Sequence, residues 1–293
     1  MTALNLANNQ FKKLTEKEEL YQKLPRFKNI DLTANQLSEF PAGLISSFQL
    51  TNLILDSNQI NTFSNAAFYN ETSVENIHLT ANQIKTFPTS LNRIQNLNHL
   101  RLEGNQMQET INLIGFQNLN HLVLKNNNIT GFTSDNISRN ALRILDLSKN
   151  KVSFFEQQKT IYHKLFALYL DDNQLKTFRL SIDIFPELNS LRLNKNQLSE
   201  IEILSLFESL SYLDIGENNL TTFSCLKLPN LTHLDIGKNN IKTFSCPVLP
   251  KMRHLDISNN QLSKMPENIY KMNDLKILYC NSNNIPGSVK WIN

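Results

Sequence analysis

Glycine is scarce in this chain, with seven residues among 293. A glycine-rich phosphate loop needs several closely spaced glycines, and neither that motif nor G-x-S-x-G occurs. The zinc-site motif H-E-x-x-H and the redox motif C-x-x-C do not occur either. We therefore predict a protein that is not an enzyme, and we assign it no catalytic residues, no cofactor and no metal.

Long apolar runs and a strong charge of one sign are also missing. No stretch is long and apolar enough to span a bilayer, and the start at Met1-Thr-Ala-Leu lacks the basic segment and apolar core of a signal peptide. The formal net charge is +3, and the basic residues are scattered along the chain. We therefore predict no membrane span, no nucleic-acid partner and a monomer.

The chain is rich in copies of one short pattern. The clearest copy is Leu231-Thr-His-Leu-Asp-Ile-Gly-Lys-Asn-Asn-Ile241, with apolar residues at positions one, four, six and eleven. Its position-nine asparagine recurs thirteen times, at spacings of 21 to 26 residues, which indicates a repeat architecture. These asparagines are Asn9, Asn35, Asn58, Asn82, Asn105, Asn127, Asn150, Asn173, Asn196, Asn218, Asn239, Asn260 and Asn283.

Positions three to seven alternate between variable and apolar residues, a period of two that predicts one short strand in each repeat. One repeat cannot bury its apolar face alone, so stacked repeats must share a core lined by residues such as Leu55, Leu102, Leu147 and Leu193. Three residues after position eleven, a second apolar line is mostly phenylalanine. We interpret this line as an aromatic spine behind the sheet.

The pattern L-x-x-L-x-L-x-x-N-x-L resembles the leucine-rich repeat family from end to end of the chain. The resemblance implies an α/β solenoid, the leucine-rich repeat horseshoe, with about thirteen repeats. It also implies a parallel sheet on the concave face, mixed short helices and extended segments on the convex face, and a ladder of stacked position-nine amides. We expect a single domain over residues 1–293, with the last repeat at about 275–293.

Local patterns in the connecting segments predict further features. A capping box at Thr15-Glu-Lys-Glu18 predicts a short helix over about 16–24. We interpret Phe155–Leu165 and Leu198–Leu210 as candidate helices. Trp291 is a candidate to pack over the end of the core.

Cysteine is rare, with Cys225, Cys246 and Cys280 in the whole chain. Secreted leucine-rich repeat proteins usually carry paired-cysteine caps, and the lack of such clusters favours a reducing compartment. Cys225 and Cys246 occupy the same place in consecutive repeats, so we expect a buried thiol pair rather than a disulfide. Cys280 replaces a core leucine at position six, and we expect it to serve as packing.

Positions three, five, seven and eight face the concave side, the usual binding surface of such solenoids. Aromatic and arginine side chains are the common anchors of protein interfaces. We therefore predict a partner-binding site on one group of these positions. Its residues are Tyr169, Arg192, Tyr212, Asp214, His233, Asp235, His254 and Asp256.

His233, Asp235, His254 and Asp256 form the densest group of polar side chains. Two histidines and two aspartates on neighbouring strands suggest a metal site, but polar concave surface or part of a protein-binding patch is the better-supported interpretation. We expect both histidines to titrate above their ordinary pKa, because neighbouring aspartates stabilise an imidazolium.

Two biological settings suit these features. The Pro-containing repeats of about 23 residues and the missing cysteine caps resemble effectors of intracellular bacterial pathogens. This predicts a chain located inside cells, secreted by a bacterium into the host cytosol, that binds a host protein. The alternative is the trimmed extracellular domain of a eukaryotic innate-immune recognition protein.

Overall fold

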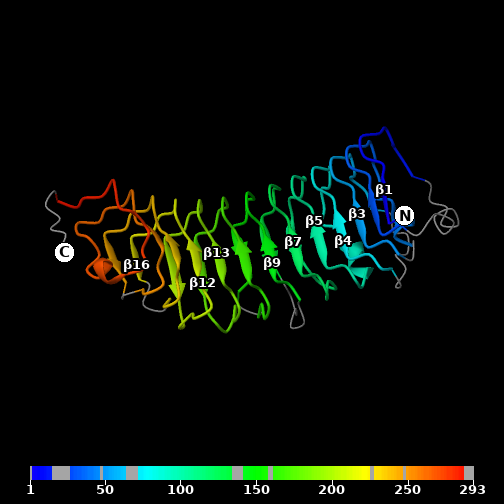
Figure 1. Ribbon diagram of the computed structural model, residues 1–293. Helices are drawn as coiled ribbons and strands as arrows, with labels where there is room; N and C mark the ends of the chain where they lie inside the picture. The colour runs from blue at the N-terminus through cyan, green and yellow to red at the C-terminus, as the bar shows by residue number, and fades with distance from the viewer. Residues whose placement is uncertain are drawn as a thin grey trace. The chain divides into compact units, whose positions relative to one another are not determined.

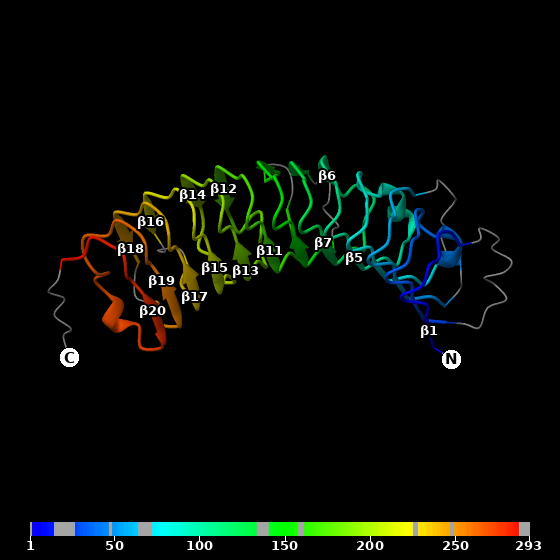
Figure 2. The same ribbon diagram turned by 90° about the horizontal axis from the view of Figure 1, so that it is seen from above.

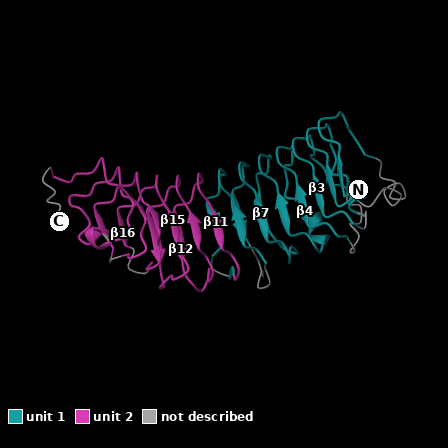
Figure 3. Ribbon diagram, viewed as in Figure 1, with its two compact units in different colours: residues 1–162 teal, residues 163–293 magenta. Residues whose placement is uncertain are grey.

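The computed structural model describes residues 2–14, 27–46, 49–63, 72–133, 141–157, 161–224, 228–246 and 249–286. The chain divides into two compact units, residues 1–162 (unit 1) and residues 163–293 (unit 2), coloured separately in Figure 3. The single continuous domain expected from the sequence stays a prediction. The expected helix over 16–24, Trp291 and Cys225 lie outside the described residues.

Unit 1 contains seven short parallel strands, each formed by positions three to five of one repeat (Figure 1). Neighbouring strands pair in register, so equivalent positions of successive repeats lie side by side. In sheet order these strands are β1 (Ala3–Asn5), β2 (Asn29–Asp31), β3 (Asn52–Ile54), β4 (Asn76–His78), β5 (His99–Arg101), β7 (His121–Val123) and β9 (Ile144–Asp146).

Unit 2 repeats this arrangement with six strands that also pair in parallel and in register. In sheet order they are β11 (Ala167–Tyr169), β13 (Ser190–Arg192), β15 (Tyr212–Asp214), β17 (His233–Asp235), β19 (His254–Asp256) and β20 (Ile277–Tyr279). The two units together therefore contain thirteen repeat strands, and the predicted leucine-rich repeat solenoid is confirmed.

Shorter elements lie on the opposite side of each unit (Figure 2). In unit 1 these are the 3-10 helices η1 (Ala42–Ser46) and η2 (Thr89–Arg93) and the strands β6 (Thr110–Asn112), β8 (Gly131–Thr133) and β10 (Phe154–Phe155). In unit 2 they are β12 (Thr177–Leu180), β14 (Glu200–Ile203), β16 (Thr222–Ser224), β18 (Thr243–Ser245) and η3 (Ile269–Lys271). The predicted mixture of short helical and extended segments is confirmed. Within the described ranges, no helix has the length and apolar character needed to cross a membrane.

The core lies between these two layers. The four leucines predicted to point inward, Leu55, Leu102, Leu147 and Leu193, are fully buried. The aromatic spine is also confirmed by stacked pairs such as Phe40–Phe63, with ring centroids 5.1 Å apart, and Phe132–Phe155 at 5.3 Å. Apolar stacking behind the sheet therefore holds successive repeats together, as the period of the sequence requires.

The position-nine asparagines form the expected ladder. Asn239 donates from Nδ2 to the carbonyl oxygens of Ile236 in its own repeat and Ile215 in the preceding repeat, at 3.1 Å each. Its Oδ1 accepts the backbone N–H of Leu220 at 3.0 Å. Asn82 makes the same three contacts in unit 1. Each amide thus satisfies three buried backbone groups that the end of a short strand would otherwise leave unpaired.

Position eight has a left-handed backbone in every repeat, a feature that the repeat pattern does not predict. Its φ angles lie between +52° and +67°, and twelve of the thirteen residues are not glycine. The backbone turns sharply here so that the following asparagine points back into the core. The uniformity of this turn explains why the ladder has the same geometry at each junction.

Two predictions about the connecting segments are wrong. Leu198–Leu210 contains strand β14, because Glu200-Ile-Glu-Ile203 alternates with a period of two and pairs in parallel with β12. An ion pair between Arg179 and Glu202 at 3.6 Å links the two strands. The described part of Phe155–Leu165 contains no helix.

The cysteine prediction is also wrong for Cys246, which is disulfide-bonded. Cys280 is a free thiol, as expected, but it is only half-buried rather than enclosed in the core. It follows β20, the last strand of unit 2, so no further described strand covers it.

Candidate protein-binding face

The eight residues predicted to bind a partner all lie in unit 2, on the side of the sheet away from the core. We call this side of each unit its open face. In register, Tyr212, His233 and His254 follow one another at position three of β15, β17 and β19. Asp214, Asp235 and Asp256 follow one another at position five of the same strands. The sheet therefore builds two parallel lines, which we call the ring column and the carboxylate row.

The ring column is a continuous stack. The Tyr212 and His233 ring centroids are 4.2 Å apart with planes only 5° apart, and the His233 and His254 centroids are also 4.2 Å apart. Tyr279, which stands at position five of β20 in register with Asp256, contacts the His254 ring edge-on, with centroids 5.7 Å apart. This spacing follows from the distance between adjacent parallel strands, because each strand contributes one ring.

Arg192 extends the stack toward β11. Its guanidinium carbon lies 4.9 Å from the ring centroid of Tyr169 and 5.3 Å from that of Tyr212. A guanidinium held between two aromatic faces gains cation–π stabilisation from both. The three residues predicted as anchors are thus one interlocked group, and Arg192 remains exposed at its centre.

The carboxylate row is anchored by the backbone. Asp214, Asp235 and Asp256 accept the N–H of the residue two positions later, at 3.2, 2.8 and 2.8 Å. For Asp214 and Asp235 that residue is a glycine. A Cβ built on Gly237 would lie 3.0 Å from Oδ1 of Asp256 and 3.2 Å from Oδ1 of Asp235. Two carboxylates therefore converge on a space that a larger residue would occupy.

Burial and mutual repulsion shift the protonation of this face. Burial, reinforced by the charge of Asp235, raises the pKa of Asp214 to about 7. Burial also raises the pKa of Asp235 and of the Tyr212 hydroxyl. The Asp214 carboxyl is therefore only partly ionised near neutral pH.

The expected rise in histidine pKa is wrong for His233. Burial lowers its pKa to about 4, and the neighbouring His254 and Arg192 lower it further, while Asp256 opposes them. Desolvation outweighs the aspartates because the imidazole is stacked between two rings. His233 is therefore a neutral aromatic surface at neutral pH.

Metal binding finds no geometric support on this face. Across the described residues, no group of three or more histidine, cysteine, aspartate or glutamate side chains is arranged to hold a metal ion. The stacked histidine rings lie face to face instead of converging on one point.

The open face of unit 1 has different chemistry. Position three carries amides that contact one another in series, from Asn76 to Asn52 and from Asn52 to Asn29. His99 and His121 follow as a stacked pair with centroids 4.2 Å apart. In both rings Nδ1 is buried without a hydrogen-bond partner, and burial lowers both pKa values.

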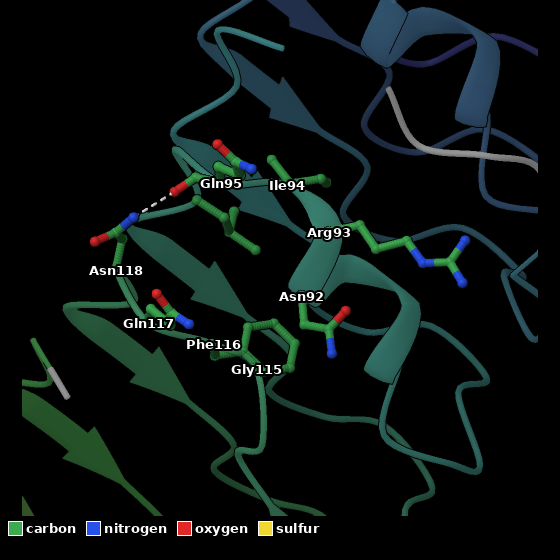
Figure 4. A pocket seen from close by; sticks show the side chains of 9 residues that line it. Asn92, Arg93, Ile94, Gln95, Gly115, Phe116, Gln117 and Asn118 are labelled. Carbon is green, nitrogen blue, oxygen red and sulfur yellow. Dashed lines mark hydrogen bonds between the residues drawn. The ribbon is translucent and has the colours of Figure 1, made fainter. Parts of the chain in front are cut away.

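Unit 1 also has a pocket of about 330 Å³ (Figure 4). It lies between η2 with the residues after it and the equivalent segment of the next repeat. Asn118 donates to the carbonyl oxygen of Gln95 at its edge, at 2.7 Å. Its single charged lining residue is Arg93, whose side chain points away from the other labelled residues in Figure 4. The pocket therefore lacks the paired acid and base groups of a catalytic centre.

Sequence comparison supports the repeat architecture directly. A model described as leucine rich repeat matches residues 48–107, and a second, described as leucine rich repeats in two copies, matches residues 250–292. No curated protein sequence matches the chain significantly.

Solved structures with the same fold come from several kingdoms. A leucine-rich repeat protein of Leptospira interrogans superimposes with a TM-score of 0.72 at 23% identity, covering 98% of this chain and 79% of that one. The leucine-rich effector YopM of Yersinia pestis gives 0.67 at 22% identity, covering 89% and 73%. A chain of the Drosophila Toll–Spätzle complex gives 0.74 at 24% identity, covering 92% and 39%.

These structural matches are each below 25% identical, so they bear on the fold. The thirteen motif copies, the asparagine ladder and the two family matches point to the same family. The chain is a leucine-rich repeat protein.

Proposed function

We propose that the open face of unit 2 binds a protein partner. Leucine-rich repeat solenoids serve in general as interaction scaffolds, and their sheet face is the usual contact surface. The observation that carries the proposal is the interlocked group of Tyr169, Arg192 and Tyr212. Rigid aromatic and arginine side chains bind with little loss of conformational entropy, because their packing already holds them in place.

The remaining predicted residues extend this surface. Asp214, His233, Asp235, His254 and Asp256 are each half-buried beside their neighbours on adjacent strands. They form a polar surface that continues directly from the three anchors. We propose that a partner lies across several strands and contacts both lines.

The proposal is tested by capture from cell lysate with a matched control. The bait variant Tyr169→Ala, Arg192→Ala, Tyr212→Ala removes the anchors from unit 2. The control variant His99→Ala, Arg101→Ala, His121→Ala removes one position-five and two position-three residues from unit 1. We expect a partner that binds the unmodified chain and the control but not the bait variant. Equal capture by all three proteins, with both variants folded, would contradict the proposal.

For the biological setting, we propose an effector of an intracellular bacterial pathogen that engages a host protein in the host cytosol. The fold likeness to YopM, described as a leucine-rich effector protein, supports this setting. The repeats of about 23 residues with proline in their turns support it as well.

A specific observation favours the second setting, a trimmed extracellular recognition domain. Cys246 is disulfide-bonded, and disulfides persist mainly in oxidising compartments. The fold likeness to a chain of the Toll–Spätzle complex agrees with this alternative. Thiol alkylation followed by mass spectrometry of the protein from its native source separates the two settings. A blocked Cys246 supports the extracellular alternative, and an alkylated Cys246 supports the cytosolic effector.

A further inference from the structure

Two neighbouring strands of unit 1, β5 and β7, each begin with a histidine (Figure 1). His99 and His121 are register partners, and their rings stack with centroids 4.2 Å apart and planes 18° apart. The next register partners are not aromatic, because they are Asn76 on β4 and Ile144 on β9. The two imidazoles therefore form an isolated stacked pair.

The hydrogen bonding around this pair is incomplete. In the described part of the chain, five buried side-chain nitrogen or oxygen atoms have no hydrogen-bond partner. Four of them lie here: Nδ1 of His99 and of His121, and Oδ1 of Asn98 and of Asn120, the residues just before the histidines. Since buried polar groups are normally paired, this concentration of unpaired atoms costs free energy in the stacked arrangement.

Protonation raises that cost. A neutral imidazole has one donor and one acceptor nitrogen, whereas an imidazolium is a donor at both. Because no hydrogen bond reaches Nδ1 of His99 or His121, the charged form has a buried N–H without an acceptor while the rings stay stacked. Protonation of both rings also places two positive charges face to face. The stacked geometry therefore favours neutral rings.

The surrounding charges do not compensate two imidazolium ions. Arg101 and Glu103, in the same repeat as His99, form an ion pair at 3.0 Å. The acidic and basic side chains around the pair are equal in number, three of each, so their formal charges cancel. The titratable and charged groups are Glu75 and His78 from the repeat of β4, Arg101 and Glu103 from that of β5, Lys125 from that of β7, and Arg143 and Asp146 from that of β9.

The pKa shifts agree with this geometry. Burial lowers the pKa of His99, and Glu75 opposes the shift. Burial also lowers the pKa of His121, which the charges of His99 and Arg143 lower further. The pKa of His78 falls for the same main reason. The stacked pair therefore contributes stability above pH 6.5, and this contribution is lost as the pH falls.

We propose that the His99–His121 stack is an acid-sensitive switch in the open face of unit 1: the rings stay stacked when neutral, and protonation separates them and turns them toward water. The inference does not depend on the proposed function, because the anchors for a partner lie in unit 2. The histidines of the unit 2 stack differ, since neither His233 nor His254 has a buried nitrogen among the unpaired atoms of the described residues.

Nuclear magnetic resonance on the full chain tests the switch directly. Nuclear Overhauser effects between the rings of His99 and His121 should be present at pH 7 and absent at pH 4.5. The variant His99→Phe keeps an aromatic ring and removes its charge. In this variant the titration midpoint of His121 should rise by about 0.7 pH units, the shift expected when a unit charge about 4 Å away in water is removed.

Thermal melts provide a second, independent readout. The double variant His99→Phe, His121→Phe places a C–H where each unpaired Nδ1 lies, so it should be at least as stable as the unmodified chain at pH 7. Between pH 7 and pH 4.5, the melting temperature of the unmodified chain should fall by about 3 °C more than that of the double variant. The matched control His163→Phe alters an exposed histidine of unit 2 and should fall as much as the unmodified chain.

The proposal is overturned if the ring–ring effects persist at pH 4.5, or if the double variant loses as much melting temperature on acidification as the unmodified chain. An unchanged His121 midpoint in His99→Phe would overturn it as well, because the rings would then not sense each other's charge. If the double variant does not fold, the ring–ring effects in the unmodified chain decide the question, because they need no substitution.

Discussion

The two units share one scaffold and differ in what they display on it. Asn82 in unit 1 and Asn239 in unit 2 make the same three hydrogen bonds. On the open faces, however, unit 1 places amides that contact one another, whereas unit 2 places rings beside an unbroken row of acids. In unit 1 the amides of Asn29, Asn52 and Asn76 pair with one another, whereas His99 and His121 each keep an Nδ1 without a hydrogen-bond partner. The comparison shows that the residues that build the fold and the residues displayed on the open face occupy different positions of the same repeat.

The largest effect should come from the shared core. Leu122 and Leu234 are fully buried at position four of their repeats. Substituting either by alanine removes buried methyl groups and leaves a cavity, which costs about 2–5 kcal/mol of unfolding free energy. We expect similar losses in the two units, measured by urea denaturation. A cost confined to one unit would show that the two scaffolds are not equivalent.

The ladder should give the next largest effect. Asn82→Ala and Asn239→Ala each leave one backbone N–H and two carbonyl groups without the amide contact. An unsatisfied buried group costs about 1–3 kcal/mol, so we expect about 2–4 kcal/mol for each variant once water reaches some of the groups. Denaturation midpoints check the values. A neutral result in either unit would mean that the ladder there is dispensable.

The pH dependence of stability should distinguish the open faces. The pKa of Asp214 rises from 3.8 to about 7 on folding, so its contribution to stability is present below pH 3.8 and is lost as the pH rises toward 7. The pKa of His233 falls from 6.5 to about 4, so its contribution is present above pH 6.5 and is lost as the pH falls toward 4. In the unmodified chain these two trends oppose each other.

Single substitutions should separate the two trends. Relative to the unmodified chain, Asp214→Asn should gain stability as the pH rises from 4 to 7, and His233→Gln should gain as the pH falls from 6.5 to 4. His99→Gln in unit 1 should behave like His233→Gln, because burial lowers the pKa of His99 too. Thermal melts across this range provide the measurement. If the stability of Asp214→Asn and that of the unmodified chain change in parallel with pH, the raised pKa of Asp214 is refuted.

The smallest effect should come from position eight. Lys149 in unit 1 and Lys195 in unit 2 are exposed and have φ angles of 54° and 53°. Because glycine adopts this conformation without steric cost, Lys149→Gly and Lys195→Gly should each stabilise by about 0.5–1 kcal/mol. Urea midpoints should rise slightly and equally in both units. A loss of stability would show that the lysine stems contribute packing that outweighs the backbone strain.

Much of the fold follows from the sequence because the same motif occurs thirteen times at a nearly constant spacing. The period alone places Leu193 in the core and Tyr212, His233 and His254 in one column. The left-handed position eight has no residue signature, since alanine, lysine, serine and aspartate all occupy it. The sequence therefore predicts where the asparagines are needed, but not the backbone turn that aims them.

The wrong predictions have physical causes that cannot be read from a single sequence. Leu198–Leu210 has a mixed apolar pattern that suggested a helix. Its residues Glu200–Ile203 pair with β12 instead, and this pairing fixes them as a strand. For His233, counting neighbouring charges gave the wrong sign, because desolvation in the ring stack exceeds their attraction. The sandwich of Arg192 between Tyr169 and Tyr212 depends on side-chain rotamers, so the spacing of those residues predicted a shared face but not their contact.

The asparagine ladder joins successive repeats through the same hydrogen bonds at each step. One asparagine and one backbone N–H join Asn260 to Ile241, and an equivalent pair joins Asn239 to Leu220. Removing residues 231–251, one whole repeat that includes the disulfide-bonded Cys246, would bring Leu220 to Asn260 with the same hydrogen-bonding groups. The open face would lose His233 and Asp235, and the remaining strands would keep their register. The length of the open face can therefore be changed in steps of one strand without altering the register of the strands that remain.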